Sequence, residues 1–156
     1  PHILGPTGSD LSKHDKNHDI LAGYHNDLNF LTIHGKSRFP GLYIWLKDGS
    51  RLAVKVPEGC LLMQAGMQLE HLTGGDVIAG FHEVVVNERT LDVIEQRKAA
   101  NKTLWRVSST LFSQIASDQL LQPIGKFANA PRAKNFPPML TGHQVQRELE
   151  AIALQK

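Results

Sequence analysis

The chain has 156 residues, of which 41% are hydrophobic, 21% are charged and 6% are aromatic. This length suits one compact domain, and the hydrophobic share excludes a disordered tail protein. Seventeen Lys and Arg residues against fifteen Asp and Glu give a formal charge of only +2, which is not the footprint of a nucleic-acid-binding domain. The apolar runs are far shorter than the roughly 20 residues of a membrane helix, so we expect a soluble, cytoplasmic protein without membrane contact.

Cysteine and histidine content limits the metal chemistry of the chain. Cys60 is the only cysteine, which excludes an intrachain disulfide and a thiolate zinc cluster. We interpret Cys60 as a small hydrophobic residue buried in an apolar strand. Eight histidines therefore carry any metal chemistry.

The first part of the chain predicts a loop, and the middle predicts an antiparallel β core. Residues 1–23 are rich in Gly, Pro and polar residues, so we expect a loop after a short strand at Ile3-Leu4. Asp48-Gly49 predicts a tight hairpin turn, and the alternation over 51–56 predicts one wet and one buried face. Six runs rich in β-branched and large apolar residues predict strands: 28–34, 42–46, 51–56, 60–65, 77–86 and 104–112.

Two segments have helical patterns. Residues 87–102 are polar with Leu91, Ile94 and Lys98 at helical spacing, which predicts a helical insertion between two strands. The tail after Pro138 offers Thr141 as an N-cap, followed by apolar residues at positions 145, 149 and 152. This pattern predicts an amphipathic helix that packs on the sheet.

The residues that carry metal chemistry begin at His25-Asn26-Asp27. In an extended chain His25 and Asp27 point to the same side, so an imidazole and a carboxylate can converge on one ion. His82 lies in a second strand-like run, 57 positions later. Two histidines and one carboxylate leave open positions on the ion, as in non-haem Fe(II) oxygenases.

A second pair offers a receptor for a carboxylate. Arg106 and Ser108 share one face of a predicted strand and present a guanidinium fork and a hydroxyl. A diacid could then chelate the metal at one end while Arg106 holds the other.

At these residues the sequence resembles the isopenicillin N synthase-like branch of the Fe(II)- and 2-oxoglutarate-dependent dioxygenases. The block at His25 and Asp27 is similar to the first metal motif, His82 to the distal histidine, and Arg106-x-Ser108 to the motif for the cosubstrate carboxylate. The resemblance continues through residues 57–59, 62–73 and 135–143. It implies that His25, Asp27 and His82 bind catalytic Fe(II), and that Arg106 and Ser108 bind the cosubstrate 2-oxoglutarate.

The resemblance also implies a fold and a reaction. The expected fold is mainly β, a double-stranded β-helix (jelly roll) with a helical insertion and a C-terminal helix, in one catalytic domain over residues 1–156. The expected reaction consumes O2 and 2-oxoglutarate, releases succinate and CO2, and oxidises a small organic substrate, by default through hydroxylation. No nucleic-acid or membrane partner is expected.

Three features depart from the family. The helical insertion lengthens the interval from His82 to Arg106, and Gly66-Met67 stands where the family has Gly-Asp. Residues 2–6 match poorly the aromatic strand that helps the family hold the cosubstrate, which leaves a second cosubstrate contact unassigned. Since a jelly roll needs eight strands and we predict six, we expect a catalytic part that lacks the family's N-terminal half and has unpaired strand edges and an uncovered apolar face.

Other residues have a structural interpretation beside the functional one. His71 is the nearest alternative to His82, but its surroundings predict a short helix and a supporting position. We assign His14 and His18 to a solvated loop, and His34, at a strand end, to a structural or pocket-lining role. The following residues either line a substrate pocket or pack in the β core: Tyr24, Asn29, Trp45 and Trp105.

Two other function classes remain open at this stage. The chain could be a metal-binding β-sandwich module, or an incomplete fragment, without turnover. A cupin-like isomerase or sugar-binding protein would explain the histidines but not Arg106 and Ser108.

Overall fold

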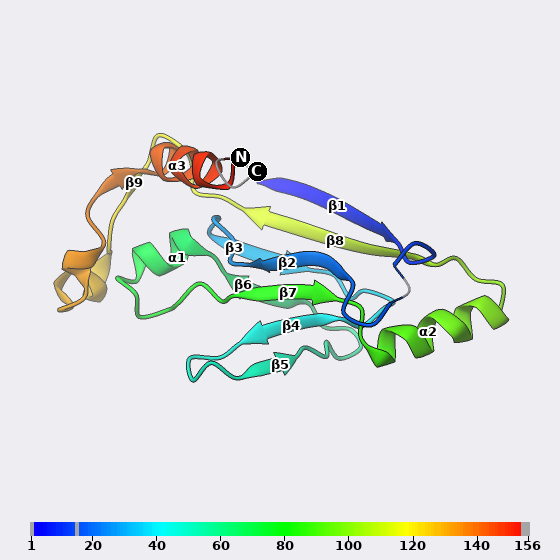
Figure 1. Ribbon diagram of the computed structural model, residues 1–156. Helices are drawn as coiled ribbons and strands as arrows, with labels where there is room; N and C mark the ends of the chain where they lie inside the picture. Colours follow the sequence, from blue (N-terminus) through cyan, green and yellow to red (C-terminus); the bar gives the residue numbers. More distant parts are fainter. Residues whose placement is uncertain (1, 15, 154–156) are drawn as a thin grey trace.

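The computed structural model describes residues 2–14 and 16–153. Two four-stranded antiparallel sheets lie face to face and form a double-stranded β-helix (Figure 1). The β8 sheet has the strand order β1-β8-β3-β6, and the β7 sheet has the order β2-β7-β4-β5. This architecture confirms the predicted fold class.

The strands and helices follow one another with short connections. The β8 sheet consists of β1 (Ile3–Asp10), β3 (Leu31–His34), β6 (Leu62–Ala65) and β8 (Trp105–Ser113). The β7 sheet consists of β2 (Ile20–His25), β4 (Leu42–Trp45), β5 (Arg51–Ala53) and β7 (His82–Val85). The remaining elements are α1 (Met67–Leu72), α2 (Glu88–Ala99), α3 (Thr141–Ala153), a small hairpin of β9 (Leu120–Leu121) and β10 (Met139–Leu140), and the 3-10 helices η1 (Gly125–Asn129) and η2 (Ala133–Asn135).

The N-terminal segment forms two strands, so the predicted short strand at Ile3-Leu4 is longer than expected, and the loop prediction is wrong for residues 5–10 and 20–23. β1 pairs with β8 at every position from Ile3, opposite Phe112, to Asp10, opposite Trp105. β1 lies at the edge of its sheet, where Gly and Pro are tolerated, and long-range pairing outweighs its weak local strand signal. With β2 on the other sheet, the two four-stranded sheets hold eight strands between them, and the predicted shortage of strands is wrong.

The hairpin and the inserted helix form as predicted. Gly49 has φ +81° in the turn between β4 and β5, a conformation that favours glycine. Asn87 caps α2 by accepting a hydrogen bond from the backbone N–H of Thr90, whose hydroxyl accepts one from the backbone N–H of Asn87. The predicted alternation over 51–56 fails, because β5 ends at Ala53 and all three of its residues are exposed on an edge strand.

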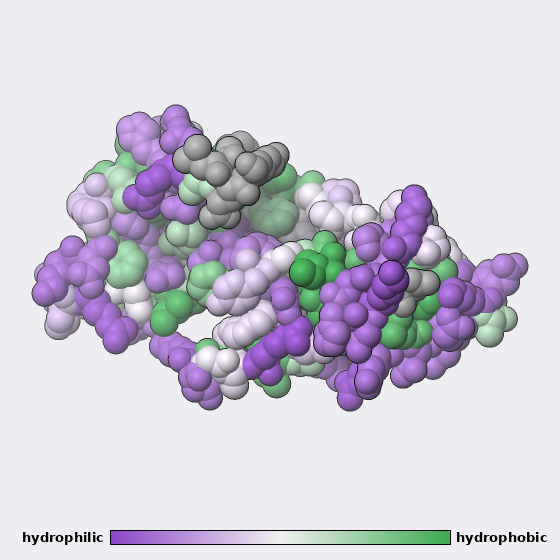
Figure 2. All heavy atoms as spheres, viewed as in Figure 1, coloured by the Kyte–Doolittle hydropathy of each residue, from purple (hydrophilic) through white to green (hydrophobic). Residues whose placement is uncertain are grey.

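The main hydrophobic cluster lies where α2 meets the sheets. Leu11, Phe39, Val86 and Ile94 are almost fully buried there. The cluster therefore holds the inserted helix to the body of the molecule. Figure 2 shows a largely hydrophilic surface over α2 and the 3-10 helices, with hydrophobic residues in separate patches.

The outer face of the β8 sheet carries an apolar row. Leu4, Leu111, Ile33 and Met63 occupy matched positions on β1, β8, β3 and β6. Leu4 is 68% and Met63 59% exposed, while Leu111 and Ile33 are half-buried. This face of the sheet therefore presents a continuous apolar stripe to its surroundings.

Two sequence predictions about packing are corrected. Cys60 is exposed, because it lies in the loop before β6 rather than inside a strand. α3 forms, but Thr141 is its first residue, not its cap, and the Thr141 hydroxyl donates to the Gln119 carbonyl. Leu149 and Ile152 are more than half exposed, so the apolar face of α3 is not packed on the sheet as predicted.

α3 is instead held by a polar contact, since the side chain of Gln144 hydrogen-bonds to Gln68 of α1 and to the Leu28 carbonyl.

None of the helices in the described part of the chain has the length and apolar character that a membrane span requires.

Candidate active site

The candidate metal ligands come together between the two sheets. His25 ends β2 and His82 begins β7, and these two residues are directly opposed in the antiparallel ladder. Asp27 follows two residues after β2. The ligand atoms of His25, Asp27 and His82 all lie within 4.8 Å of one another. Asp27 Oδ1 is 3.7 Å from His25 Nε2 and 3.9 Å from His82 Nε2.

Backbone carbonyls orient both imidazoles. His25 Nδ1 lies 2.6 Å from the Gly23 carbonyl, and His82 Nδ1 lies 3.3 Å from the Gly80 carbonyl. Because a carbonyl oxygen can only accept, each Nδ1 must carry the proton in these contacts. Both Nε2 atoms then present a lone pair toward Asp27. Burial lowers the pKa of His82, and this also favours the neutral form that binds metals.

A buried polar network orients the carboxylate. The Thr32 hydroxyl donates to Asp27 Oδ2 at 2.5 Å, which leaves Oδ1 facing the two histidines. Asn29 Nδ2 donates to Thr32 Oγ1 and to the Leu31 carbonyl. Asn29 and Thr32 are almost completely buried, so they are supporting residues and not part of a substrate pocket. In the sequence, Thr32 can be recognised as a hydroxyl residue between the apolar residues Leu31 and Ile33 of β3.

The loop that carries Asp27 is fastened to the start of α1. The backbone N–H groups of Met67 and Gln68 donate to the Asp27 and Asn29 carbonyls. Gly66 packs so closely that an added Cβ would lie 2.0 Å from the Asn29 carbonyl oxygen. Only glycine at position 66 therefore lets the start of α1 approach the Asn29 backbone this closely.

A cavity of about 500 Å³ extends from the metal cluster between the two sheets. Its apolar walls include Leu42 and Val84 from the β7 sheet and Leu62 and Phe112 from the β8 sheet. Apolar walls lower the local dielectric and so strengthen electrostatic interactions beside them.

Arg106 and Ser108 line the same cavity, on the predicted shared face of β8. Arg106 is only 8% exposed, and burial lowers its pKa. Its Nε is buried without a hydrogen-bond partner, and no acidic residue of the described chain forms an ion pair with it. A buried guanidinium in this state favours an anionic ligand.

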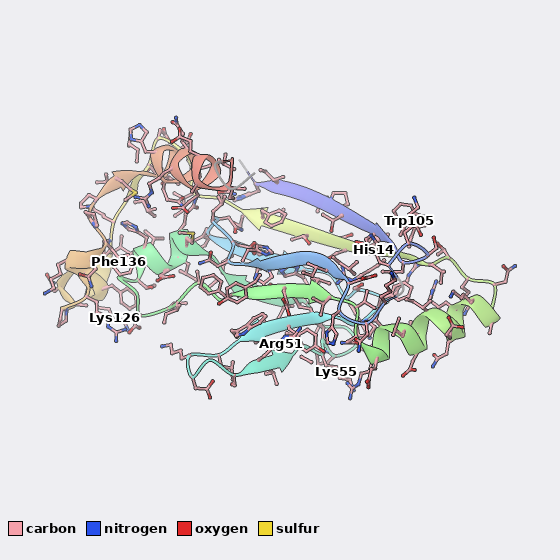
Figure 3. All side chains as sticks on the ribbon, in the orientation of Figure 1. His14, Arg51, Lys55, Trp105, Lys126 and Phe136 are labelled. Carbon is pink, nitrogen blue, oxygen red and sulfur yellow. The ribbon has the colours of Figure 1, made fainter. Side chains whose placement is uncertain are left out.

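Other candidates lie away from this site. His71 is buried in α1, and its Nε2 contacts the Pro137 carbonyl. His14 lies in the loop after β1 (Figure 3), as does His18, which confirms the predicted loop placement. His34 ends β3 and lines the cavity.

The aromatic candidates do not line the cavity. Tyr24 stacks on Phe81 and meets Trp45 edge-on, in a partly exposed cluster. Arg51, labelled in Figure 3, extends this cluster from β5 by lying over the Trp45 and Tyr43 rings. Trp105 is half exposed at the start of β8 (Figure 3).

Residues 9–115 match the model of the 2OG-Fe(II) oxygenase superfamily. The chain belongs to this superfamily. The superfamily uses Fe(II) and 2-oxoglutarate, which confirms the predicted family and its cofactors; the narrower isopenicillin N synthase-like branch stays a prediction. None of the curated proteins matches the chain in sequence.

Solved structures of oxygenases share the fold. A 2OG-Fe(II) oxygenase family protein from Caulobacter crescentus is 24% identical, with a TM-score of 0.76 over 97% of this chain and 46% of that protein. T7H from Neurospora crassa, solved with alpha-KG and 5-formyluracil, is 16% identical, with a TM-score of 0.74 over 96% of this chain and 47% of T7H. The rice dioxygenase for auxin oxidation is 16% identical, with a TM-score of 0.70 over 88% of this chain and 43% of that enzyme. The chain thus spans less than half the length of these structures.

Proposed function

We propose that the chain is the catalytic domain of an Fe(II)- and 2-oxoglutarate-dependent oxygenase that oxidises a small organic molecule. The observation that carries this proposal is the pairing, in one cavity, of a two-histidine, one-carboxylate cluster with a buried, unpaired Arg106. The cluster alone would suit several divalent metals. The unpaired guanidinium favours a cosubstrate with a second carboxylate.

The donor atoms suit an Fe(II) ion. His25 and His82 each offer a neutral Nε2, and Asp27 offers Oδ1, so three protein ligands leave positions open for a chelating cosubstrate. When bound, the iron supplies O2 activation coupled to decarboxylation of 2-oxoglutarate, which yields succinate and CO2.

The chain's own residues bind, orient and shield the reactants. Arg106 provides two parallel N–H donors for the far carboxylate of 2-oxoglutarate, and Ser108 adds a hydroxyl beside it. The Thr32 hydroxyl holds Asp27 in place, so the ligand arrangement does not have to reorganise when the metal binds. The apolar walls beside Arg106 and the cluster lower the local dielectric, which strengthens the attraction of both for an anionic cosubstrate.

Anaerobic titration tests the proposal. The protein with one equivalent of Fe(II) should develop the visible absorption of an iron chelate when 2-oxoglutarate is added, and admitting O2 should then produce succinate. Succinate can be measured without knowing the substrate, because such enzymes release some succinate in uncoupled turnover. Iron binding without the chelate absorption would favour the alternative of a metal-binding β-sandwich without turnover.

A further inference from the structure

Each candidate metal-binding histidine follows a glycine and an aromatic residue. The two segments are Gly23-Tyr24-His25 at the end of β2 and Gly80-Phe81-His82 at the start of β7. In both segments the glycine carbonyl accepts a hydrogen bond from Nδ1 of the histidine, at 2.6 Å in the first and 3.3 Å in the second. The proposed function gives each histidine a role but leaves the two aromatic residues without one.

The aromatic rings lie on the opposite face of the sheet from the metal cluster. Side chains alternate between the two faces of a strand, so each ring points outward where the following histidine points into the cavity. Both histidines line the cavity, whereas Tyr24 and Phe81 do not. Tyr24 is 54% and Phe81 39% exposed. Any effect of these rings on a bound metal ion must therefore pass through the backbone that carries the histidines.

The two rings are in contact with each other and with a third ring. The ring centroids of Tyr24 and Phe81 are 4.6 Å apart, and the ring planes are nearly parallel, at 4°. Trp45 of β4 meets Tyr24 edge-on, with a centroid distance of 4.7 Å and an angle of 85°. Stacked and edge-on pairs at such distances are the arrangements in which aromatic rings attract each other. Tyr24 is thus held from two sides.

The two rings that hold Tyr24 are fixed within the sheet. The backbone N–H of Trp45 donates to the Phe81 carbonyl at 3.0 Å. Arg51 of β5 lies over the Trp45 ring and forms an ion pair with Glu83 of β7. These contacts connect β5, β4 and β7, so Phe81 and Trp45 form a platform that does not depend on β2.

The end of β2 needs such support, because its pairing is interrupted just before the metal ligand. Ala22 lies opposite Val84, and His25 lies opposite His82. β2 therefore advances by three residues over a stretch in which β7 advances by two. The extra residue breaks the regular ladder, as in a β-bulge. The backbone that leads to His25 is thus loosely paired at the place where the histidine must be fixed.

We propose that Tyr24, Phe81 and Trp45 form an aromatic clamp that positions the end of β2 and so holds His25 beside His82 before a metal ion binds. This inference rests on the metal-binding part of the proposed function. Tyr24 and Phe81 are positioning residues, since they act through the histidines that follow them. Ligands that are already held in place lose less freedom when the ion binds, which raises the affinity.

Anaerobic titration with Fe(II) alone, against a chromophoric chelator, tests the clamp without cosubstrate or turnover. One aromatic pair is worth about two- to tenfold in an equilibrium constant. Tyr24→Leu removes two pairs but keeps an apolar side chain, so it should raise the Fe(II) dissociation constant about fivefold or more. Tyr24→Phe keeps the ring and should bind Fe(II) as the unmodified protein does. Trp105→Leu is the matched control, because Trp105 is also half exposed but lies on the β8 sheet.

The visible absorption of bound Co(II) separates a positioning role from damage to the ligand set. Tyr24→Leu should need more Co(II) for saturation but should reach the same spectrum at saturation, because all three ligands are still present. His82→Ala should not reach that spectrum. Thermal unfolding of each variant shows whether the fold is intact at the temperature of the titrations.

A second variant keeps the inference testable if Tyr24→Leu folds poorly. Phe81→Leu removes the stacked pair from its other partner, so it should also raise the Fe(II) dissociation constant. Because both substitutions break the same contact, the double variant should lose less affinity than the sum of the two single losses.

The outcomes distinguish the clamp from the proposed function. An unchanged Fe(II) dissociation constant in Tyr24→Leu and Phe81→Leu, or an equal rise in Trp105→Leu, would overturn the clamp and leave the proposed function standing. Weak binding in Tyr24→Phe or an altered Co(II) spectrum at saturation would also overturn it. Failure of the unmodified protein to bind Fe(II) would overturn both proposals, whereas failure to bind 2-oxoglutarate would overturn only the proposed function.

Discussion

His25 and His82 face each other across the β2–β7 ladder, with their ring centroids 4.3 Å apart. Directly opposed positions in an antiparallel pair bring Cβ atoms to within about 4.5–5.5 Å, so strand register alone brings these two rings together. Asp27, two residues beyond the end of β2, places Oδ1 at 3.7 and 3.9 Å from the Nε2 atoms of His25 and His82. The Thr32 hydroxyl holds this carboxylate by donating to Oδ2. Two residues separated by 57 positions thus become neighbours through backbone pairing.

The first prediction concerns the metal ligands. His82→Ala should abolish stoichiometric Fe(II) binding, because it removes a buried ligand of the cluster. Equilibrium dialysis with iron analysis measures the loss. His71→Ala is the matched control, because His71 is also a buried histidine but lies outside the cluster. Loss of iron in His71→Ala and retention in His82→Ala would contradict the assignment.

The second prediction concerns the cosubstrate carboxylate. A bidentate charged contact contributes roughly 1.5–3 kcal/mol, or about 10- to 150-fold in affinity. Arg106→Lys keeps the charge but loses the planar fork, so 2-oxoglutarate binding should weaken by about tenfold or more. Iron binding should survive, since Arg106 is not among the cluster residues. Equal 2-oxoglutarate affinities in both proteins would remove Arg106 from this role.

The third prediction concerns support of Asp27. Thr32→Val keeps the shape of the side chain but removes the hydroxyl that donates to Asp27 Oδ2. Loss of such a supporting contact lowers metal affinity by about 10- to 100-fold. Competition with a chromophoric chelator gives the Fe(II) dissociation constants of both proteins. An unchanged constant would show that Asp27 is held by the surrounding backbone instead.

The fourth prediction concerns Gly66. A Cβ at this position would overlap the Asn29 carbonyl, so Gly66→Ala should lower the free energy of unfolding by about 1–3 kcal/mol or more. Urea denaturation measures the change. Gly23→Ala is the control, because no atom lies within 4 Å of the added methyl group. Similar losses in both variants would show that the close contact at Gly66 is not the cause.

The fifth prediction concerns pH. Burial lowers the pKa of His71 below its ordinary value of 6.5, so the folded protein binds this proton less readily than the unfolded chain. The contribution of His71 to stability is complete above about pH 6.5 and is lost as the pH falls through its folded pKa. The urea midpoint of the metal-free protein should therefore fall between pH 7.5 and 5.5.

A variant without the titrating ring isolates this effect. His71→Asn should show a smaller fall over the same interval, although His34 and His82 shift in the same direction and keep part of the slope. An equal fall of the urea midpoint in both proteins would mean that His71 does not contribute to the pH dependence of stability.

The sequence predicted which residues meet at the cavity better than it predicted the N-terminal strands. His25, Asp27 and His82 were identified by the order of motifs, and the structure brings them together, although their role in binding iron stays a prediction. β1 was missed because Gly5, Pro6 and Gly8 oppose strand formation locally, and only pairing with β8 reveals the strand. Long-range pairing of this kind leaves little trace in local composition.

Supporting residues were harder still to predict. The roles of Thr32 and Gly66 depend on which carbonyl or carboxylate faces them, and this is decided by contacts between distant segments. For Leu149 on α3 the sequence predicted packing on the sheet, but the residue is exposed. A helical apolar pattern does not say whether a partner surface is present.

The position of β2 at the edge of its sheet has a further consequence. β2 pairs with β7 through an irregular ladder, with register shifts on both sides of Ala22. An ion held by both His25 and His82 would join this weakly paired strand to its neighbour. Amide hydrogen exchange along residues 20–25 should accordingly slow when metal is bound, while exchange in the central strands changes little. Slow loss of iron would then begin with fraying of β2, and metal retention would depend on the dynamics of this strand.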